Sequence, residues 1–137
     1  MAKRTKMNVT QLEGKVFSGS GKGADFVRLP WVKTQMAEKL GFTPYDGTLN
    51  IKLNERSLTL KRLFLNKAKS IQILPAEGYC RGKCVKGVFM EKLECAIIVP
   101  EVKDYPDDVI EIIAPVNLRE KLKLKDGDIA RVKILLL

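Results

Sequence analysis

Two short polar side chains, Thr48 and Asn50, stand at the start of a stretch in which Leu49, Ile51 and Leu53 are the apolar members. The alternation follows an Asp-Gly turn signal and predicts a strand whose successive side chains point to opposite faces. Thr48 and Asn50 would then share one face, and their oxygen atoms are suitable ligands for a hard cation. The alternative is that the two residues form only the polar face of a surface strand.

A glycine-rich segment, Ser18–Asp25, precedes this stretch and carries Lys22 among three alternating glycines. Such glycines leave backbone N–H groups free to turn toward an anion, so the segment is a candidate phosphate cradle. It lacks both the Gly-Lys-Ser/Thr end of a Walker loop before a helix and the spacing of the dinucleotide fingerprint. A flexible hairpin connection to a return strand at 26–29 is an equally good interpretation.

A single carboxylate, Glu111, interrupts the apolar run Val109–Ile113. The flanking isoleucines indicate a strand, and a carboxylate on a buried face of a strand costs free energy unless it has a partner or a task. Glu111 is therefore either a functional group on a partly buried face or an outward-facing residue of an edge strand. The sequence favours neither interpretation.

The composition is that of one globular domain. The chain has 137 residues, of which 45% are hydrophobic and 30% charged, and this length is enough to bury a core. We predict a basic tail at 1–10 and a single domain at 11–137. The net charge of +9 and the pI of about 9.6 favour a polyanionic partner such as nucleic acid, a nucleotide or an acidic lipid. Because the sequence has no histidine, mechanisms with an imidazole base or a His-ligated metal are excluded.

The three cysteines, Cys80, Cys84 and Cys95, are odd in number and irregular in spacing. No fourth soft ligand completes a tetrahedral zinc site, so reduced thiols are expected. The basic start of the chain has no apolar run behind it, and no segment reaches the ~18 apolar residues of a membrane span. We therefore expect a cytoplasmic protein without a membrane partner.

The elements that must position these residues are mostly short strands. Apolar runs predict strands at 12–18, 26–29, 48–53, 71–74, 109–113 and 129–137, and a hairpin of 79–90 with 93–99 that turns at Glu91-Lys92. Helices are expected at 31–40, between Pro30 and Gly41, and at 116–122. The same order of features occurs twice: a strand, a helix that starts at a proline, an Asp-Gly pair and a second strand. Residues 27–29 are the leading strand of the first copy. This repeat suggests a small barrel with pseudo-twofold symmetry.

Three blocks of sequence, taken together, are specific. They are Ser18-Gly19-Ser20-Gly21-Lys22-Gly23, Leu40-Gly41-Phe42 with Pro44-Tyr45-Asp46-Gly47-Thr48-Leu49-Asn50, and Ile110-Glu111-Ile112-Ile113-Ala114-Pro115 with Leu118-Arg119. In order and spacing, from about Leu12 to Ile134, the chain closely resembles the archaeal CTP-dependent riboflavin kinases. The resemblance implies a mainly β fold, a small closed six-stranded cradle-loop barrel with two short helices. It also implies transfer of the terminal phosphoryl group of CTP to riboflavin, giving FMN and CDP.

The resemblance also implies site residues. The family's nucleotide-binding positions match Ser20, Gly21, Lys22, Gly23, Ala24 and Asp25 in the glycine-rich segment, and Val116, Asn117, Leu118 and Arg119 after the Ala-Pro break. Its magnesium ligands match Thr48 and Asn50, and its flavin-contacting glutamate matches Glu111. A second flavin-contacting position, usually a threonine, aligns with Lys103, where this chain departs from the family pattern.

The implied chemistry suits these residue types. Phosphoryl transfer depends mainly on positioning and charge neutralisation, so Mg²⁺, backbone N–H groups and a few cations suffice without an imidazole. Lys22 and Arg119 are the cations expected on phosphate. Thr48 and Asn50 are enough to hold Mg²⁺ when nucleotide phosphates complete its shell. Glu111 could accept a hydrogen bond from the flavin or act as general base on the attacking hydroxyl, and both roles are open.

A second hypothesis is a basic cradle-loop barrel that binds nucleic acid, as related transcription regulators do. Its support is the net charge and the basic cluster between Lys61 and Lys69. A charge run is more often a solvated face, and no aromatic residues interleave with this one as stacking platforms. We therefore expect CTP/CDP and riboflavin/FMN as partners, rather than nucleic acid, and a monomer.

Overall fold

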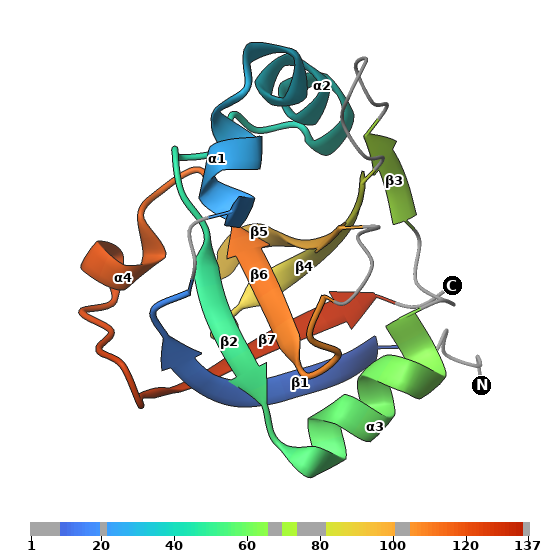
Figure 1. Ribbon diagram of the computed structural model, residues 1–137, viewed down its shortest axis with the longest axis vertical. Coiled ribbons are helices and arrows are strands. Elements are labelled where there is room, and N and C mark those ends of the chain that lie inside the picture. The colour runs from blue at the N-terminus through green and yellow to red at the C-terminus, as the bar shows by residue number, and fades with distance from the viewer. Residues whose placement is uncertain (1–8, 20–21, 66–69, 74–81, 101–104, 136–137) are drawn as a thin grey trace, which may run out of the picture.

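The chain folds into a barrel of short strands with helices on its outside (Figure 1). The computed structural model describes residues 9–19, 22–65, 70–73, 82–100 and 105–135. Within these residues the fold is mainly β, with a closed six-stranded antiparallel barrel, one additional strand and four short helices. The predicted barrel is confirmed, whereas the predicted number of two helices is too low.

Seven strands of the described chain form one antiparallel sheet in the order β3-β4-β5-β6-β2-β1-β7. They are β1 (Val9–Phe17), β2 (Leu49–Leu53), β3 (Ser70–Ile73), β4 (Gly82–Phe89), β5 (Leu93–Pro100), β6 (Val109–Ile113) and β7 (Ile129–Leu135). A further pairing between β4 and β7 closes six of them into a ring, and β3 is added to the edge of β4. The predicted hairpin joins β4 and β5 at the expected turn. Closure pairs edges that such short strands would otherwise expose.

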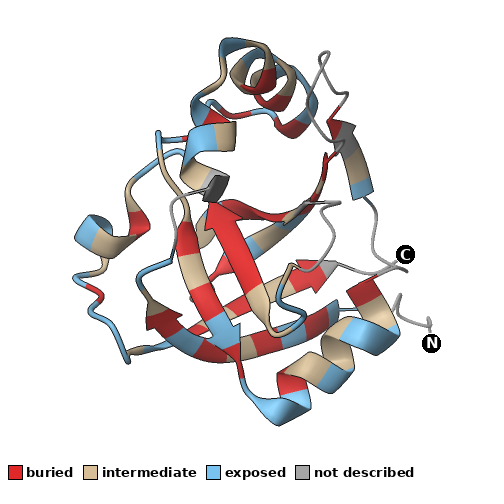
Figure 2. Cartoon of the chain, in the orientation of Figure 1, coloured by how far each residue is buried: buried red, intermediate tan, exposed pale blue. Residues whose placement is uncertain are grey.

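Apolar side chains form two clusters, one inside the barrel and one on its outer face. Figure 2 shows that buried positions lie both on the barrel strands and on the helical segment outside the barrel. The alternation along β5 separates them, because Cys95 and Ile97 lie in the interior cluster while Ala96 and Ile98 lie in the outer one. The outer cluster also contains buried residues of the helical segment that follows the glycine-rich segment. β5 is therefore buried on both faces, which explains its continuous apolar run.

The helices are α1 (Lys22–Arg28), α2 (Pro30–Leu40), α3 (Glu55–Phe64) and α4 (Leu118–Lys121). The two predicted helices are confirmed as α2 and α4. Gly41 ends α2 in the left-handed conformation with φ of 85°, and Asn117 caps α4 by accepting a hydrogen bond from the Glu120 backbone N–H. None of the helices in the described part of the chain is long and apolar enough to cross a membrane.

The predicted return strand at 26–29 is wrong, because these residues belong to α1 and the short link after it. β1 already pairs with β2 along one edge and with β7 along the other, so it has no edge for a returning strand. Phe26 and Val27 pack instead in the outer cluster, where the Phe26 ring meets Trp31 edge-on at a centroid distance of 6.1 Å. The hairpin interpretation of the glycine-rich segment and the leading strand of the first predicted repeat are therefore also wrong.

Helix α3 was not predicted, because the apolar residues of 55–65 do not follow one helical face. Leu63 is 55% exposed, while Ser57 is buried. Asn54 caps the start of the helix, because its side chain accepts a hydrogen bond from the Ser57 backbone N–H at 2.8 Å. The Ser57 hydroxyl in turn accepts from the Glu13 backbone N–H at 2.7 Å. Polar caps and a contact to β1, rather than a strong apolar stripe, thus hold this helix in place.

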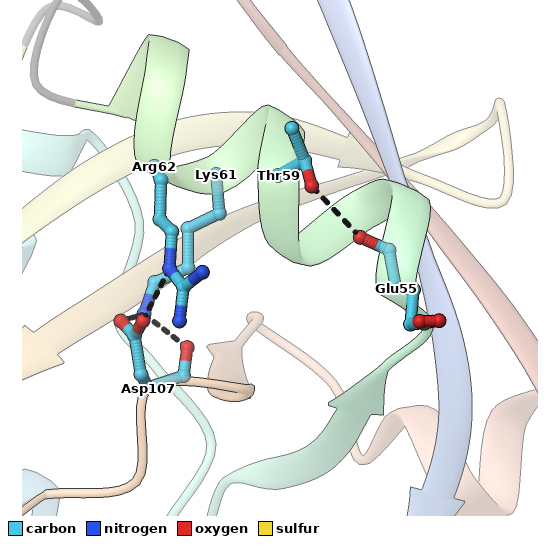
Figure 3. A network of polar contacts seen from close by, with 5 residues as sticks. All are labelled: Glu55, Thr59, Lys61, Arg62 and Asp107. Atoms are coloured by element: carbon cyan, nitrogen blue, oxygen red, sulfur yellow. Dashed lines mark hydrogen bonds and ion pairs between the residues drawn. The ribbon is translucent and has the colours of Figure 1, made fainter.

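Near its other end, α3 is joined to the turn before β6 through Asp107 (Figure 3). Arg62 Nε donates to Asp107 Oδ2 at 2.7 Å, and Lys61 Nζ donates to the Asp107 backbone oxygen at 2.6 Å. Lys61 and Arg62, the members of the basic cluster that the structure describes, are therefore paired with an aspartate of the same chain. This pairing weakens the case for a nucleic-acid-binding patch. Lys67 and Lys69 lie outside the described residues.

Asp107→Asn is expected to lower stability at neutral pH by no more than about 1 kcal/mol, since the ion pairs are exposed. Hydrogen bonds from Arg62 and Lys61 hold the pKa of Asp107 below its usual value of 3.8. A depressed carboxyl pKa stabilises the fold above the usual value, and this stabilisation is lost as the pH falls through the folded value. Thermal melts should therefore separate variant and wild type at pH 7 and converge in acid. A difference in melting temperature that persists below the usual carboxyl pKa would contradict this account; Glu38→Gln, at an exposed position of α2, is the control.

Cys84 and Cys95 are buried free thiols, as predicted for reduced cysteines. Burial raises the pKa of each to about 12, so both are neutral at physiological pH. Cys80 lies outside the described residues.

Candidate active site

The polar residues of β2 and β6 lie together because the two strands pair in antiparallel register. Asn50 is the register partner of Glu111, and Leu49 is that of Ile112. Since Leu49 and Ile112 belong to the interior cluster, Asn50 and Glu111 face outward. Thr48 lies on the same side, and its Oγ1 donates a hydrogen bond to Glu111 Oε1 at 2.7 Å. Residues from two separate stretches of the sequence thus come together in the fold. We call the group of Thr48, Asn50 and Glu111 the polar corner.

The carboxylate of this polar corner is buried. Glu111 is only 5% exposed and β6 is paired on both sides, so Glu111 is not an outward-facing residue of an edge strand, while its functional role stays a prediction. Its second oxygen, Oε2, accepts a hydrogen bond from Tyr105 Oη at 2.5 Å. Burial and the neighbouring carboxylate both raise the pKa of Tyr105, so its hydroxyl stays a donor throughout the physiological range. Each oxygen of Glu111 therefore has a protein donor, as a buried carboxylate requires.

The glycine-rich segment reaches the polar corner through Gly19. A Cβ atom built at Gly19 would lie 2.7 Å from Cγ and from Nδ2 of Asn50. Any other residue would push the Asn50 amide away, so the close approach requires glycine at this position. The start of the candidate phosphate cradle is thus in contact with one of the two predicted metal ligands.

A cavity of about 300 Å³ opens beside the polar corner. Thr48 forms part of its wall. The other lining residues come from the link before β2, the start of β2, the end of β6, the link between β6 and α4, and the start of α4: Tyr45, Asp46, Gly47, Leu49, Ile112, Ala114, Val116, Asn117, Leu118 and Arg119. The Tyr45 backbone N–H donates to the Ala114 oxygen at 2.8 Å, which joins the two walls at one end. All four predicted nucleotide-binding residues after the Ala-Pro break therefore line one cavity with Thr48.

Asp126 connects this cavity to the glycine-rich segment. Its carboxylate accepts from Arg119 Nη2 at 2.9 Å and from the Ser18 hydroxyl at 3.1 Å. Ser18 directly precedes Gly19, so one carboxylate ties α4 to the segment that contacts Asn50. The Arg119 guanidinium is held at the rim of the cavity, where it is partly exposed.

Known proteins share the sequence that builds this arrangement. The model of the CTP-dep_RFKase family, described as domain of unknown function DUF120, matches residues 16–134. The chain belongs to this CTP-dependent riboflavin kinase family. The match includes the glycine-rich segment, the polar corner and the cavity, and it confirms the resemblance seen in the three sequence blocks.

Several relatives carry the name riboflavin kinase. That of Methanosarcina barkeri is 43% identical over 128 residues, which cover 89% of this chain and 55% of the relative. That of Pyrobaculum aerophilum is 46% identical over 132 residues, which cover 92% of this chain and 61% of the relative. The Archaeoglobus fulgidus protein is 37% identical over 132 residues, or 92% of this chain and 55% of the relative. The chain thus spans little more than half the length of these curated relatives.

The polar corner offers oxygen donors of the kind that the predicted Mg²⁺ site requires. Thr48 and Asn50 each supply a neutral oxygen, and Mg²⁺ prefers oxygen ligands. Among the described residues there is no group of three or more His, Cys, Asp or Glu side chains that could hold a metal. The oxygen donors of Thr48 and Asn50 are compatible with a hard cation, and Mg²⁺ binding at the polar corner stays a prediction.

The glycine-rich segment is only partly described. Ser20 and Gly21 lie outside the described residues, as does Lys103, and only the backbone of Lys22 and Gly23 is described, as the start of α1. Ala24 and Asp25 follow on α1, where Asp25 forms an exposed ion pair with Arg28 at 2.5 Å. The predicted contacts of this segment with a nucleotide, and of Lys103 with a flavin, stay predictions.

Two residues of the site were not predicted. Tyr105 lies in a polar stretch that is mainly acidic. The one feature of the sequence that could have pointed to it is its aromatic side chain, six residues before Glu111. Asp126 belongs to an Asp-Gly pair that predicts a turn, and this pattern does not reveal its contacts with Ser18 and Arg119. The Asp126–Ser18 contact spans 108 residues, and the Tyr105–Glu111 contact depends on how the turn into β6 folds; a local pattern shows neither.

Proposed function

We propose that the chain is a riboflavin kinase that transfers the terminal phosphoryl group of CTP to riboflavin, giving FMN and CDP, with Mg²⁺ as cofactor. The observation that carries the proposal is the position of Thr48, which belongs to the polar corner with Asn50 and Glu111 and lines one cavity together with Val116–Arg119. The family name supports CTP as the donor, and the names of the relatives support riboflavin as the acceptor.

The cavity is the proposed nucleotide site. Its volume of about 300 Å³ lies at the lower end of the range for small-molecule pockets. Arg119 uses Nη2 on Asp126 and Nη1 on the Leu124 oxygen. A guanidinium has five N–H donors, so Arg119 retains donors for a phosphate without giving up these contacts. Leu118 is buried in the barrel core and Asn117 caps α4, so both shape the cavity wall more than they extend into it.

In the proposed reaction a riboflavin hydroxyl oxygen bonds to the terminal phosphorus of CTP. The bond from that phosphorus to the bridging oxygen breaks, CDP leaves, and the hydroxyl proton is released. Bound Mg²⁺ would neutralise charge on the phosphate oxygens. Glu111 already accepts one hydrogen bond on each oxygen, but each oxygen can accept a second. Glu111 can therefore accept a hydrogen bond from the riboflavin hydroxyl or take its proton. A loose transition state requires little proton transfer to such a base.

The direct test is to incubate the protein with riboflavin, Mg²⁺ and one nucleoside triphosphate at a time, and to separate FMN by chromatography. We expect FMN with CTP, and none when either nucleotide or Mg²⁺ is omitted. Absence of FMN with every nucleotide would refute the kinase assignment. FMN with ATP but not with CTP would keep the kinase and refute the choice of donor.

A further inference from the structure

Glu111 lies between two hydroxyl groups that both donate to it. Thr48 Oγ1 is 2.7 Å from Oε1, and Tyr105 Oη is 2.5 Å from Oε2. A threonine hydroxyl has one proton and two lone pairs. Because the Thr48 proton points at Glu111, the lone pairs of Oγ1 point away from the carboxylate and can accept a cation. Glu111 therefore sets the direction in which Thr48 offers its lone pairs.

Tyr105 holds the other side of the carboxylate, and its own backbone segment is anchored. The next residues form the turn into β6, where Asp107 is paired with Lys61 and Arg62 of α3. The Leu53 backbone N–H donates to the Asp108 oxygen at 2.7 Å, which attaches the same turn to the end of β2. The hydroxyl of Tyr105 is thus carried by a segment tied to two neighbouring elements. Without it, Oε2 of a carboxylate that is 5% exposed would lose its donor.

We propose that Tyr105 is a positioning residue of the cation site: it holds Glu111 against Thr48, so that the Thr48 hydroxyl presents its lone pairs to a divalent cation bound with a nucleotide. The inference rests on the proposed function, because it takes Thr48 as a cation ligand. Groups that orient a metal ligand in this way typically change metal affinity 10- to 100-fold when they are removed.

The test measures cation binding without turnover. Mn²⁺ is titrated into protein and CTP in the absence of riboflavin, and free Mn²⁺ is followed by electron paramagnetic resonance. Tyr105→Phe keeps the ring and removes the hydroxyl, and we expect it to weaken Mn²⁺ binding about tenfold or more. Thr59→Val, which removes an exposed hydroxyl on α3, is the matched control and should bind as the wild type does. Thermal melts of each variant report on folding.

A double-variant cycle separates positioning from a general structural effect. If Tyr105 acts through Thr48, Tyr105→Phe should weaken Mn²⁺ binding in the wild type and have no further effect in Thr48→Val. Unchanged affinity in Tyr105→Phe, or losses that add fully in the double variant, would overturn the proposal while FMN formation by the wild type still stood. If the wild type with CTP took up no Mn²⁺, the CTP and metal assignments of the proposed function would fail, and this inference with them.

Discussion

Asn50→Ala is expected to reduce the rate of FMN formation from riboflavin and CTP by at least about 100-fold, or about 2.7 kcal/mol of transition-state stabilisation. The substitution removes the amide that lies opposite Glu111 and beside Gly19. It deletes one of the two neutral oxygens proposed to hold Mg²⁺. Because Asn50 faces outward and is only partly buried, its loss leaves no cavity in the barrel core. Stability should therefore change much less than activity.

The measurement is the initial rate at saturating riboflavin, with thermal melts of the same preparations. Lys52→Ala is the control, because Lys52 is the next outward-facing residue of β2 and is exposed. Thr48→Val should lose activity as Asn50→Ala does, and Lys52→Ala should not. If Asn50→Ala and Thr48→Val both kept full activity, the metal assignment would be wrong. If Asn50→Ala lowered the melting temperature strongly, Asn50→Asp, which keeps the size and an oxygen, would separate folding from cation binding.

The same corner can be disturbed from the glycine-rich segment. Gly19→Ala places a Cβ atom within 2.8 Å of the Asn50 amide, which must turn away. The displaced group is the end of a flexible side chain, so the cost to the fold is small while the ligand is misplaced. We expect an activity between those of the wild type and Asn50→Ala, and a melting temperature close to that of the wild type.

The sequence predicts the individual strands well, but not how they meet. Alternation in 49–53 correctly places Leu49, Ile51 and Leu53 in the interior and leaves Asn50 on the other face. Nothing local in the sequence indicates that Glu111, 63 residues after Thr48, accepts its hydrogen bond. Only the family resemblance predicted that the two residues belong to one site. The resemblance carries information about the three-dimensional fold, and the periodicity of apolar residues does not.

Helices α1 and α3 could not be predicted, for different physical reasons. The apolar residues around Phe26 are compatible with a strand, and only the pairing of both edges of β1 excludes it. Helix α3 has polar caps and a weak apolar face, so hydrophobic periodicity gives little signal. In both cases tertiary contacts decide the local structure. The contacts of the buried Glu111 with Thr48 and Tyr105 are likewise tertiary contacts that no local pattern shows.

Gly14→Ala is expected to destabilise the fold by about 3 kcal/mol or more, at the upper end of the cost of overpacking. A Cβ atom at Gly14 would lie 2.2 Å from the Lys52 backbone oxygen and 2.7 Å from its carbonyl carbon. Gly14 is also the point where β1 pairs with Leu53 of β2 and with Ala130 of β7. The backbone is therefore held on both edges and cannot move away from the added methyl group without breaking one ladder.

Gly82→Ala is the matched control, because Gly82 is also a strand glycine, but among the described residues its Cβ would meet only the Phe26 ring, at 3.5 Å. Urea unfolding followed by circular dichroism should show a cost of about 1 kcal/mol or less for Gly82→Ala and a much larger cost for Gly14→Ala. Equal stability of the two variants would mean that β1 and β2 are farther apart than the structure has them. The contact of Gly19 with Asn50 would then lose its support, because Gly19 follows β1 by two residues and meets Asn50 of β2.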